Sequence, residues 1–379
     1  MAGKPGANRV VTSQAPTSAP AVAGGALVAG VTVVTALGHA PLTPVDLLVL
    51  LGVAVVLPLA FPRGWSWFVA TSAALVALLL PVGILACSFA APWIVVAITT
   101  AVSRVQLSRL LPDLPHVART AAAGYALVGS AAFTASRLGV GLFGTQEPIV
   151  ELTAVHFTFA GCGALVLATR FIGRGPRRSS ATARVATVLI ATAPAFVAAG
   201  FVSHHALPQV GGAVVLTVGV WLTATLELVA ARDRSRPAPD RLLLVVSGLA
   251  VWGPMVLAVS WAAGQHWDVP ALSIDLMVRT HGVANALAFV VCGLVAAPAR
   301  VEAPGRPSAL DGRPSGADER HERVELGLGA DRDDHLADPD LGGWVRVGVE
   351  RTVLVAHGQD ERTRTVPQAR VAQRLPGDG

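Results

Sequence analysis

The most informative stretch of this sequence is residues 65–103, which read WSWFVATSAALVALLLPVGILACSFAAPWIVVAITTAVS, 39 residues without one Asp, Glu, Lys or Arg. A helix that crosses the hydrocarbon core of a bilayer needs roughly 20 mainly apolar residues. The stretch is too long for one such helix. Pro81, Val82 and Gly83 form its natural break, because proline and glycine interrupt regular structure. It therefore predicts two consecutive spans.

The same pattern continues on both sides and predicts ten spans in all. The backbone finds no water in hydrocarbon, so each span must satisfy its own hydrogen bonds as a helix. We therefore expect an all-α, polytopic transmembrane helix bundle, with small residues at 160–164 and 211–212 as helix-packing faces. The predicted spans are 21–39, 45–61, 65–81, 83–103, 117–136, 149–171, 183–203, 209–230, 242–263 and 274–297.

The composition fits a membrane protein and argues against two other classes. Hydrophobic residues make up 53% of the chain and charged residues 14%, whereas soluble domains carry about 25% charged residues. A soluble enzyme is therefore disfavoured. The basic residues are scattered between apolar runs and form no patch, so we expect no nucleic-acid partner. Cys87, Cys162 and Cys292 lie in apolar runs without C-x-x-C spacing, which indicates neither a disulfide framework nor a thiolate zinc site.

The arginines predict the orientation of the bundle. Basic residues concentrate in the cytoplasmic loops of membrane proteins. With the N-terminus inside, 16 of the 18 Lys and Arg residues among residues 1–300 fall on the cytoplasmic side. The exceptions are Arg137, in an outer loop, and Arg279, inside the last span. We therefore predict cytoplasmic N- and C-termini.

The two ends of the chain differ from its middle. Residues 1–20 are rich in Pro, Ser and Thr and lack the short basic start of a signal peptide. We expect them to form a disordered cytoplasmic N-terminus, followed by a transmembrane helical domain at 21–297. Segment 298–379 is dominated by charged residues, Pro and Gly, and it holds no stretch that could span a bilayer. It is predicted to be a polar, disordered cytoplasmic tail.

Most chemically capable side chains fall in the outer halves of the predicted spans. Ionisable groups inside spans cost about 2.5–3.5 kcal/mol on insertion scales and often mark function. The candidates for a substrate site or proton relay come from the sixth and tenth spans, and the secondary candidates come from the outer end of the seventh. The first set is Glu151, His156, Asp275, Arg279, His281 and Asn285, and the second is His204 and His205.

Helical spacing groups these side chains. Asp275 and Arg279 are four residues apart, as are His281 and Asn285, and the two pairs lie on different sides of one helix. The tenth span is therefore expected to be surrounded by protein, and an outer pocket could collect these groups with Glu151 and His156.

We expect Glu227 to reach the inner interface. Tryptophans near span ends are expected to be interfacial anchors: Trp65, Trp67, Trp93, Trp261 and Trp267.

The residues leave several functions open. His156, His281 and either His204 or His205 could hold a catalytic zinc ion in a membrane-embedded hydrolase, with Glu151 or Asp275 as general base. His156 and His281 could instead ligate haem from two facing spans. The same side chains could also be purely structural, in a non-catalytic structural or sensory protein.

Two segments together resemble the YndJ-like family of bacterial multi-pass membrane proteins. They are residues 153–161, TAVHFTFAG, and residues 275–289, DLMVRTHGVANALAF. The resemblance implies a transporter in the bacterial cytoplasmic membrane, acting on an unknown small solute or ion. Some members have a second His where this chain has Thr158, which weighs against a metal or haem role. We therefore favour a transporter without a cofactor over an enzyme.

Overall fold

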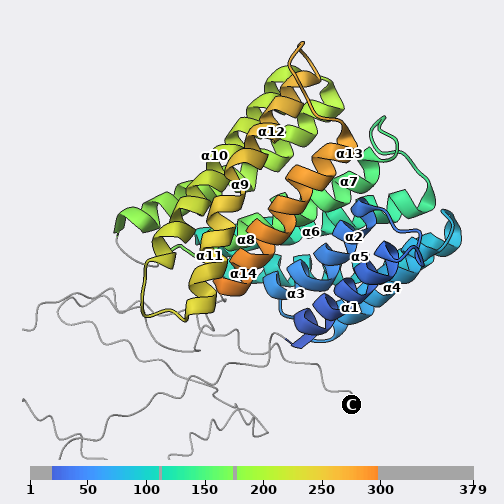
Figure 1. Cartoon of the computed structure of the whole chain (residues 1–379), viewed down its shortest axis with the longest axis horizontal. Coiled ribbons are helices and arrows are strands. Elements are labelled where there is room, and N and C mark those ends of the chain that lie inside the picture. The colour runs from blue at the N-terminus through green and yellow to red at the C-terminus, as the bar shows by residue number, and fades with distance from the viewer. Residues whose placement is uncertain (1–18, 111–112, 174–176, 298–379) are drawn as a thin grey trace, which may run out of the picture. The chain divides into compact units, whose positions relative to one another are not determined.

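The computed structural model describes residues 19–110, 113–173 and 177–297 (Figure 1). Every regular element in these ranges is helical, and one isolated bridge joins Leu142 and Thr145. The prediction of an all-α fold is confirmed. The predicted tail 298–379 and residues 1–18 of the predicted N-terminal segment lie outside the described residues.

Helices occupy all ten predicted segments, and three of these segments contain π-helical turns, labelled η. The elements are α1 (Ala19–Ala36), α2 (Pro44–Leu51), η2 (Gly52–Val56), α3 (Leu57–Ala60), α4 (Ser66–Leu79), α5 (Ile84–Leu110), α6 (Leu114–Leu138), α7 (Ile149–His156), η3 (Phe157–Gly163), α8 (Ala164–Thr169), α9 (Arg177–Ser203), α10 (Ala206–Ala231), α11 (Ala238–Ala250), α12 (Trp252–Gly264), α13 (Ile274–Met277), η4 (Val278–Gly282), η5 (Ala284–Val291) and α14 (Cys292–Ala296).

Seven of the helical segments in the described part of the chain are long and apolar enough to cross a membrane. Two more, 44–60 and 66–79, are apolar but shorter. The remaining segment is α6, where residues such as Ser130, Thr134 and Arg137 lower the hydropathy. The structure therefore supports a bundle of membrane helices without confirming the predicted count of ten spans.

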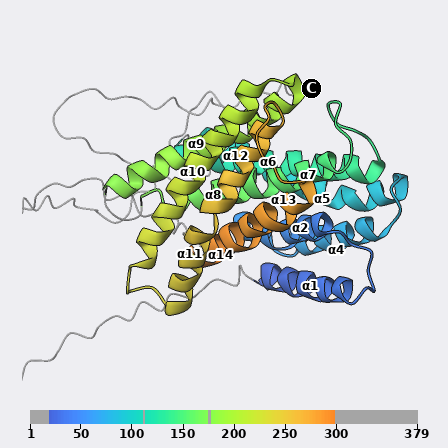
Figure 2. The same ribbon diagram turned by 45° about the horizontal axis from the view of Figure 1, so that its top comes forward.

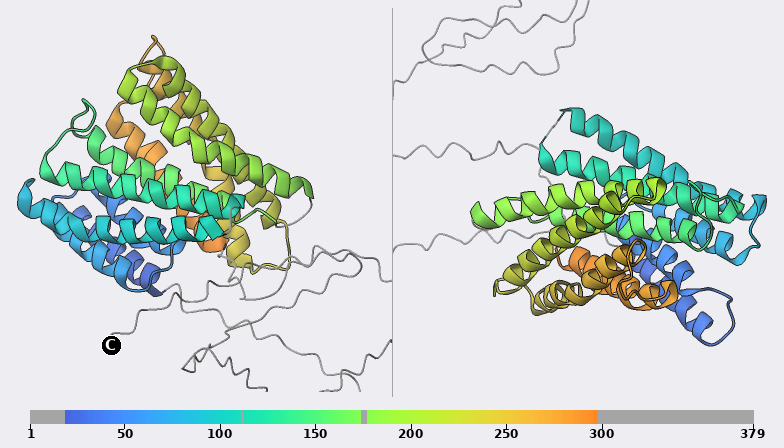
Figure 3. Two further views of the ribbon diagram at one scale, coloured as in Figure 1. Left: turned by 180° about the vertical axis from the view of Figure 1, so that it is seen from behind. Right: turned by 90° about the horizontal axis from the view of Figure 1, so that it is seen from above.

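The helices form two groups with a third between them. In Figure 1, α1–α5 lie on one side, α9–α12 lie on the other, and α13 and α14 run between the two. Figure 2 shows α1 at the edge of the bundle. From behind, in Figure 3, α5 and α6 run side by side, in agreement with their extensive contact.

The π-helical turns meet in the middle of this arrangement. η2, η3 and η5 all contact one another. A Cβ atom on Gly52 would lie 2.8 Å from the Thr158 side chain, and one on Gly163 would lie 2.5 Å from Val290. Glycine at these positions therefore allows the close packing. Because single π-helical turns in helices are frequent at functional sites, the surroundings of this contact are the natural place for a site.

Arginines join the helix termini at one end of the bundle, here called the arginine end. Arg170 is buried and donates hydrogen bonds of 2.5–2.6 Å to the carbonyl oxygens of Leu59, Leu294 and Ala297. The last carbonyl groups of a helix lack intrahelical hydrogen-bond donors. The guanidinium group of Arg170 donates the missing hydrogen bonds at the ends of α3 and α14. Arg63, in the loop after α3, donates to the carbonyl oxygen of Thr99 within α5 at 2.8 Å. These arginines belong to the set predicted to be cytoplasmic.

Two of the tryptophans do not lie where they were expected. The Trp67 side chain is 0% exposed, and its Nε1 donates to the Phe61 carbonyl oxygen at 2.7 Å. Trp93 is 1% exposed and packs on Phe133 with ring centroids 5.2 Å apart. The prediction of interfacial anchors is wrong for these two, because neighbouring helices cover them. Trp65 is exposed, as an interfacial residue would be.

Candidate functional site

A cavity of about 710 Å³ lies between the helices, toward the end of the bundle opposite the arginine end. Small-molecule sites typically measure about 300–1,000 Å³. Its walls come from α2, α6, α7, η3, α8, α9, α10, α12, α13, η4 and η5, and the loop between α6 and α7 contributes Leu142, Phe143 and Thr145. We call it the histidine cavity, because His156 and His281 both line it.

His156 reaches the cavity from the point where α7 passes into the π-helical turn η3. Its Nε2 atom is buried and has no hydrogen-bond partner among the described residues. A buried polar atom without a partner is uncommon and calls for an explanation. This nitrogen is therefore the atom best placed to bind a ligand in the cavity.

His281 and Asn285 form a second polar group on the cavity wall. His281 Nδ1 lies 2.7 Å from the Pro254 carbonyl oxygen, an acceptor, so Nδ1 carries the proton and Nε2 is left as the acceptor nitrogen of the neutral ring. Asn285 Nδ2 donates to the His281 carbonyl oxygen at 2.8 Å. Pro254 lies near the start of α12, just after the helix is interrupted at Val251. The break has a local cause, because proline cannot donate the helical hydrogen bond to the residue four positions earlier.

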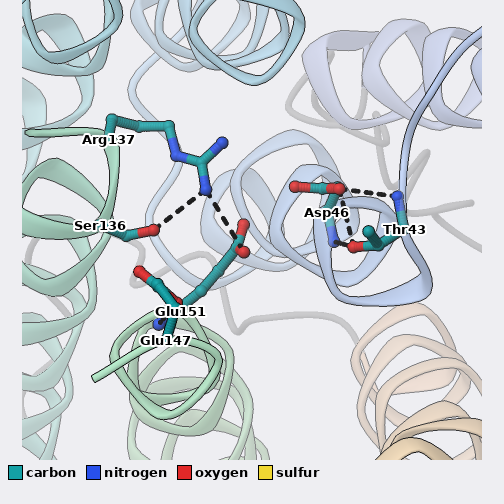
Figure 4. A network of polar contacts seen from close by, with 6 residues as sticks. All are labelled: Thr43, Asp46, Ser136, Arg137, Glu147 and Glu151. Atoms are coloured by element: carbon teal, nitrogen blue, oxygen red, sulfur yellow. Dashed lines mark hydrogen bonds and ion pairs between the residues drawn. The ribbon is translucent and has the colours of Figure 1, made fainter. Parts of the chain in front are cut away.

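Glu151 does not line the histidine cavity; it belongs to a separate buried network (Figure 4). Its carboxylate lies 3.4 Å from Arg137 Nη2, which also donates to Ser136 Oγ at 3.0 Å. Asp46 caps α2 by accepting from the Thr43 backbone nitrogen and hydroxyl group, both at 2.7 Å. In Figure 4 the Asp46 carboxyl group lies on the side that faces Glu151. The buried guanidinium group of Arg137 therefore compensates Glu151, whereas Asp46 is held by Thr43.

The pair Asp275 and Arg279 also lies outside the cavity. The two side chains are joined at 3.0 Å, and they are 70% and 59% exposed. The structure thus brings together three of the six principal candidates, His156, His281 and Asn285. It separates Glu151 and the exposed pair from them, so the single pocket imagined for all six is not formed.

The secondary candidates lie in the connection between α9 and α10, where both His204 and His205 are exposed. His204 lines a small neighbouring pocket with Gln209 and His266, and not the histidine cavity. The described residues contain no group of three or more His, Cys, Asp or Glu side chains that could hold a metal ion. The three-imidazole zinc set is therefore not assembled.

Sequence reasoning missed three buried polar groups. Arg137 is an exception to the charge rule, and its ion pair with Glu151 explains its position. Glu227 was expected at the inner interface, but it is 0% exposed and lies 2.8 Å from the Ser247 hydroxyl group. That expectation is wrong. The buried Gln209 also lines the cavity, and its Oε1 is 2.8 Å from His266 Nε2.

These features together define a class: an α-helical membrane protein with a largely apolar cavity between its helices. Within that class the chain belongs to the YndJ-like protein family, whose match covers residues 33–289. The resemblance inferred from the two motifs is thereby confirmed. The matched range contains both cavity histidines and Asn285. No curated protein and no solved structure matches the chain.

Proposed function

We propose that this protein is a transporter whose cargo site is the histidine cavity. The observation that carries the proposal is that His156 and His281, from segments far apart in the sequence, line one cavity between apolar helices. Polar groups placed inside a membrane domain and facing a cavity commonly mark a substrate pathway. The buried Nε2 of His156 without a partner supports a ligand at this position.

The π-helical turns support a site that changes shape. His156 adjoins η3, His281 lies in η4 and Asn285 lies in η5. Transporter sites commonly lie where membrane helices depart from regular geometry. These irregular turns pack on one another in the middle of the bundle, so a shift of one turn would displace the turns that it contacts.

The charge distribution supports the direction in which the site opens. Arginines gather at the end of the bundle where Arg170 and Arg236 bind helix-terminal carbonyl groups. If basic residues mark the cytoplasmic side, the histidine cavity opens toward the outer surface of the cytoplasmic membrane.

Cysteine accessibility tests this proposal without knowledge of the cargo. Cys87, Cys162 and Cys292 are replaced by Ala, and Asn285→Cys is then exposed to a membrane-impermeant maleimide in right-side-out and in inside-out vesicles. A transporter presents its site to both sides in turn, so labelling of residue 285 is expected in both preparations, more rapidly from the outside. Thr145→Cys, at the cavity mouth, is the control for outside labelling, and Ser235→Cys, in an exposed loop at the arginine end, is the control for inside labelling.

Each other outcome contradicts a stated part of the proposal. Labelling from the outside alone would identify a binding protein that does not transport. Labelling from the inside alone would reverse the orientation. If residue 285 reacts from neither side while both control positions react, the proposal that the cavity is open to solvent is contradicted.

A further inference from the structure

The histidine cavity excludes charge from its walls. Its lining in the described part of the chain contains no Asp, Glu, Lys or Arg side chain. The ionisable groups closest in sequence are held elsewhere, because Glu151 is paired with Arg137 and Asp275 with Arg279. The cavity therefore offers no counter-charge to an ion.

Apolar side chains make up most of the wall. Aromatic rings contribute from four different helical segments, through Phe159, Phe201, Trp261 and Phe289. Burying apolar surface in such a wall is favourable by about 25 cal/mol per Å². Moving a polar solute or an ion into it costs several kcal/mol for each group left without a hydrogen bond. The wall therefore favours a hydrocarbon body over a hydrated solute.

A few neutral polar groups interrupt this wall. His156 Nε2 and Gln209 Nε2 are both buried without a hydrogen-bond partner among the described residues. His281 uses Nδ1 on the Pro254 carbonyl oxygen, which leaves its Nε2 as an acceptor. Groups of this kind satisfy one uncharged oxygen, since a hydroxyl or carbonyl group can exchange hydrogen bonds with an imidazole or an amide.

The mouth of the cavity is apolar as well. Phe143 and Val202 line it, and they are 76% and 50% exposed. A molecule dissolved in the outer part of the bilayer would therefore meet hydrocarbon contacts before it reached the histidines. This suits a molecule that enters from the membrane.

We propose that the histidine cavity binds an uncharged lipid-like molecule, with an alkyl or isoprenoid body along the apolar wall and one hydroxyl or carbonyl oxygen at His156. The inference rests on the proposed function for the role of the cavity as a cargo site. It narrows the cargo from a small solute or ion to a neutral amphiphile.

A photoreactive long-chain alcohol that carries a diazirine on its chain is the probe. The purified full-length protein in lipid nanodiscs is irradiated with it, and the modified peptides are mapped by mass spectrometry. Saturable labelling is expected within 149–164 and 278–290. An excess of unlabelled long-chain alcohol should compete, whereas sodium or potassium salts should not. Labelling spread over all exposed helix faces without saturation would overturn the proposal.

Two neighbouring alanines of α9 provide a matched pair of variants. Ala198 lines the cavity, whereas Ala199 does not and is exposed. Ala198→Trp fills the cavity and should weaken saturable labelling about tenfold, the equivalent of about 1.4 kcal/mol. Ala199→Trp adds the same side chain outside the cavity and should leave labelling unchanged. Equal labelling of the two variants would contradict the assignment of the site.

The position of the polar head has its own test. His156→Phe keeps the apolar volume and removes the nitrogen, so it should reduce labelling by the alcohol probe. A diazirine hydrocarbon of the same length without the hydroxyl group should label the wild type and this variant alike. If the variant loses labelling by both probes, or by neither, His156 is not the partner of the hydroxyl group.

The outcomes separate this inference from the transporter proposal. Saturable labelling together with one-sided accessibility of residue 285 would leave a lipid-binding protein that does not transport. Two-sided accessibility without saturable labelling would leave a transporter with a different cargo and would overturn the neutral amphiphile.

Discussion

Arg137 Nη2 lies 3.4 Å from Glu151 Oε2, and both side chains are about one-tenth exposed. The two residues belong to neighbouring helices, at the end of α6 and the start of α7. The carboxyl group of Asp46, also buried, lies on the side of Glu151 and is bonded to Thr43 (Figure 4). Arg137 is therefore the basic partner of Glu151 in a low-dielectric region.

Arg137→Ala should be strongly destabilising. Removing one partner of a buried ion pair typically costs about 3–5 kcal/mol, because the other charge is left without compensation. A drop in the thermal melting temperature of the detergent-solubilised protein measures the effect, and adding Glu151→Gln should recover part of it. Arg279→Ala breaks the exposed pair with Asp275 and should cost at most about 1 kcal/mol. Equal losses for the two arginine variants would contradict this account.

Arg170→Gln should weaken the arginine end of the bundle. The guanidinium group donates to three carbonyl oxygens on two separate helical segments, and hydrogen bonds to a charged group contribute about 1.5–3 kcal/mol each. We expect a loss of stability above about 3 kcal/mol and faster proteolysis near residue 297. The exposed Arg232 is the control, and Arg232→Ala should leave both readouts near wild type. Unchanged stability of Arg170→Gln would show that the three carbonyl groups do not depend on it.

Gly212→Ala should separate α9 from α10, whereas Gly211→Ala should not. A Cβ atom at Gly212 would lie 2.8 Å from the backbone nitrogen of Val197, while one at Gly211 meets nothing within 4 Å. Overpacking typically costs about 1–3 kcal/mol. A glycine-to-alanine change at a helix position with free space around the Cβ atom is neutral or stabilising by up to about 1 kcal/mol. Melting temperatures of the two variants test the contrast, and the reverse order would refute the predicted packing.

The fold was largely predictable because span length and apolarity are properties of the sequence itself. Each predicted segment corresponds to a helical one in the described residues. The span count was less secure, because α6 and the two shorter segments are helical without being long and apolar enough to be recognised as spans. Small residues in the sequence identified packing faces. Which of the two glycines meets α9 depends on how α10 is rotated about its axis, and in the structure it is Gly212 and not Gly211.

The site was predictable in its residue types and less so in its grouping. Helical spacing placed His281 and Asn285 on one side of a helix, and the structure has both on the cavity wall. The meeting of His156 and His281 depends on contacts between π-helical turns, which periodicity does not reveal. Arg137 and Glu151 lay at the same predicted end of consecutive spans with opposite charge, and that signal could have suggested their ion pair. Glu227 gave no such signal, because its partner Ser247 carries no charge.

Cross-linking between residues 156 and 281 tests the central claim, that both line one cavity, most directly. His156→Cys and His281→Cys are combined in the variant without native cysteines, with a protease site inserted in the exposed loop at 233–235. Treatment with a short flexible bis-maleimide should keep the two fragments joined after cleavage, whereas His156→Cys with Leu242→Cys, an exposed position on α11, should not. Efficient reaction of each cysteine with a single maleimide, but no joined fragments in the 156–281 pair, would contradict the shared cavity.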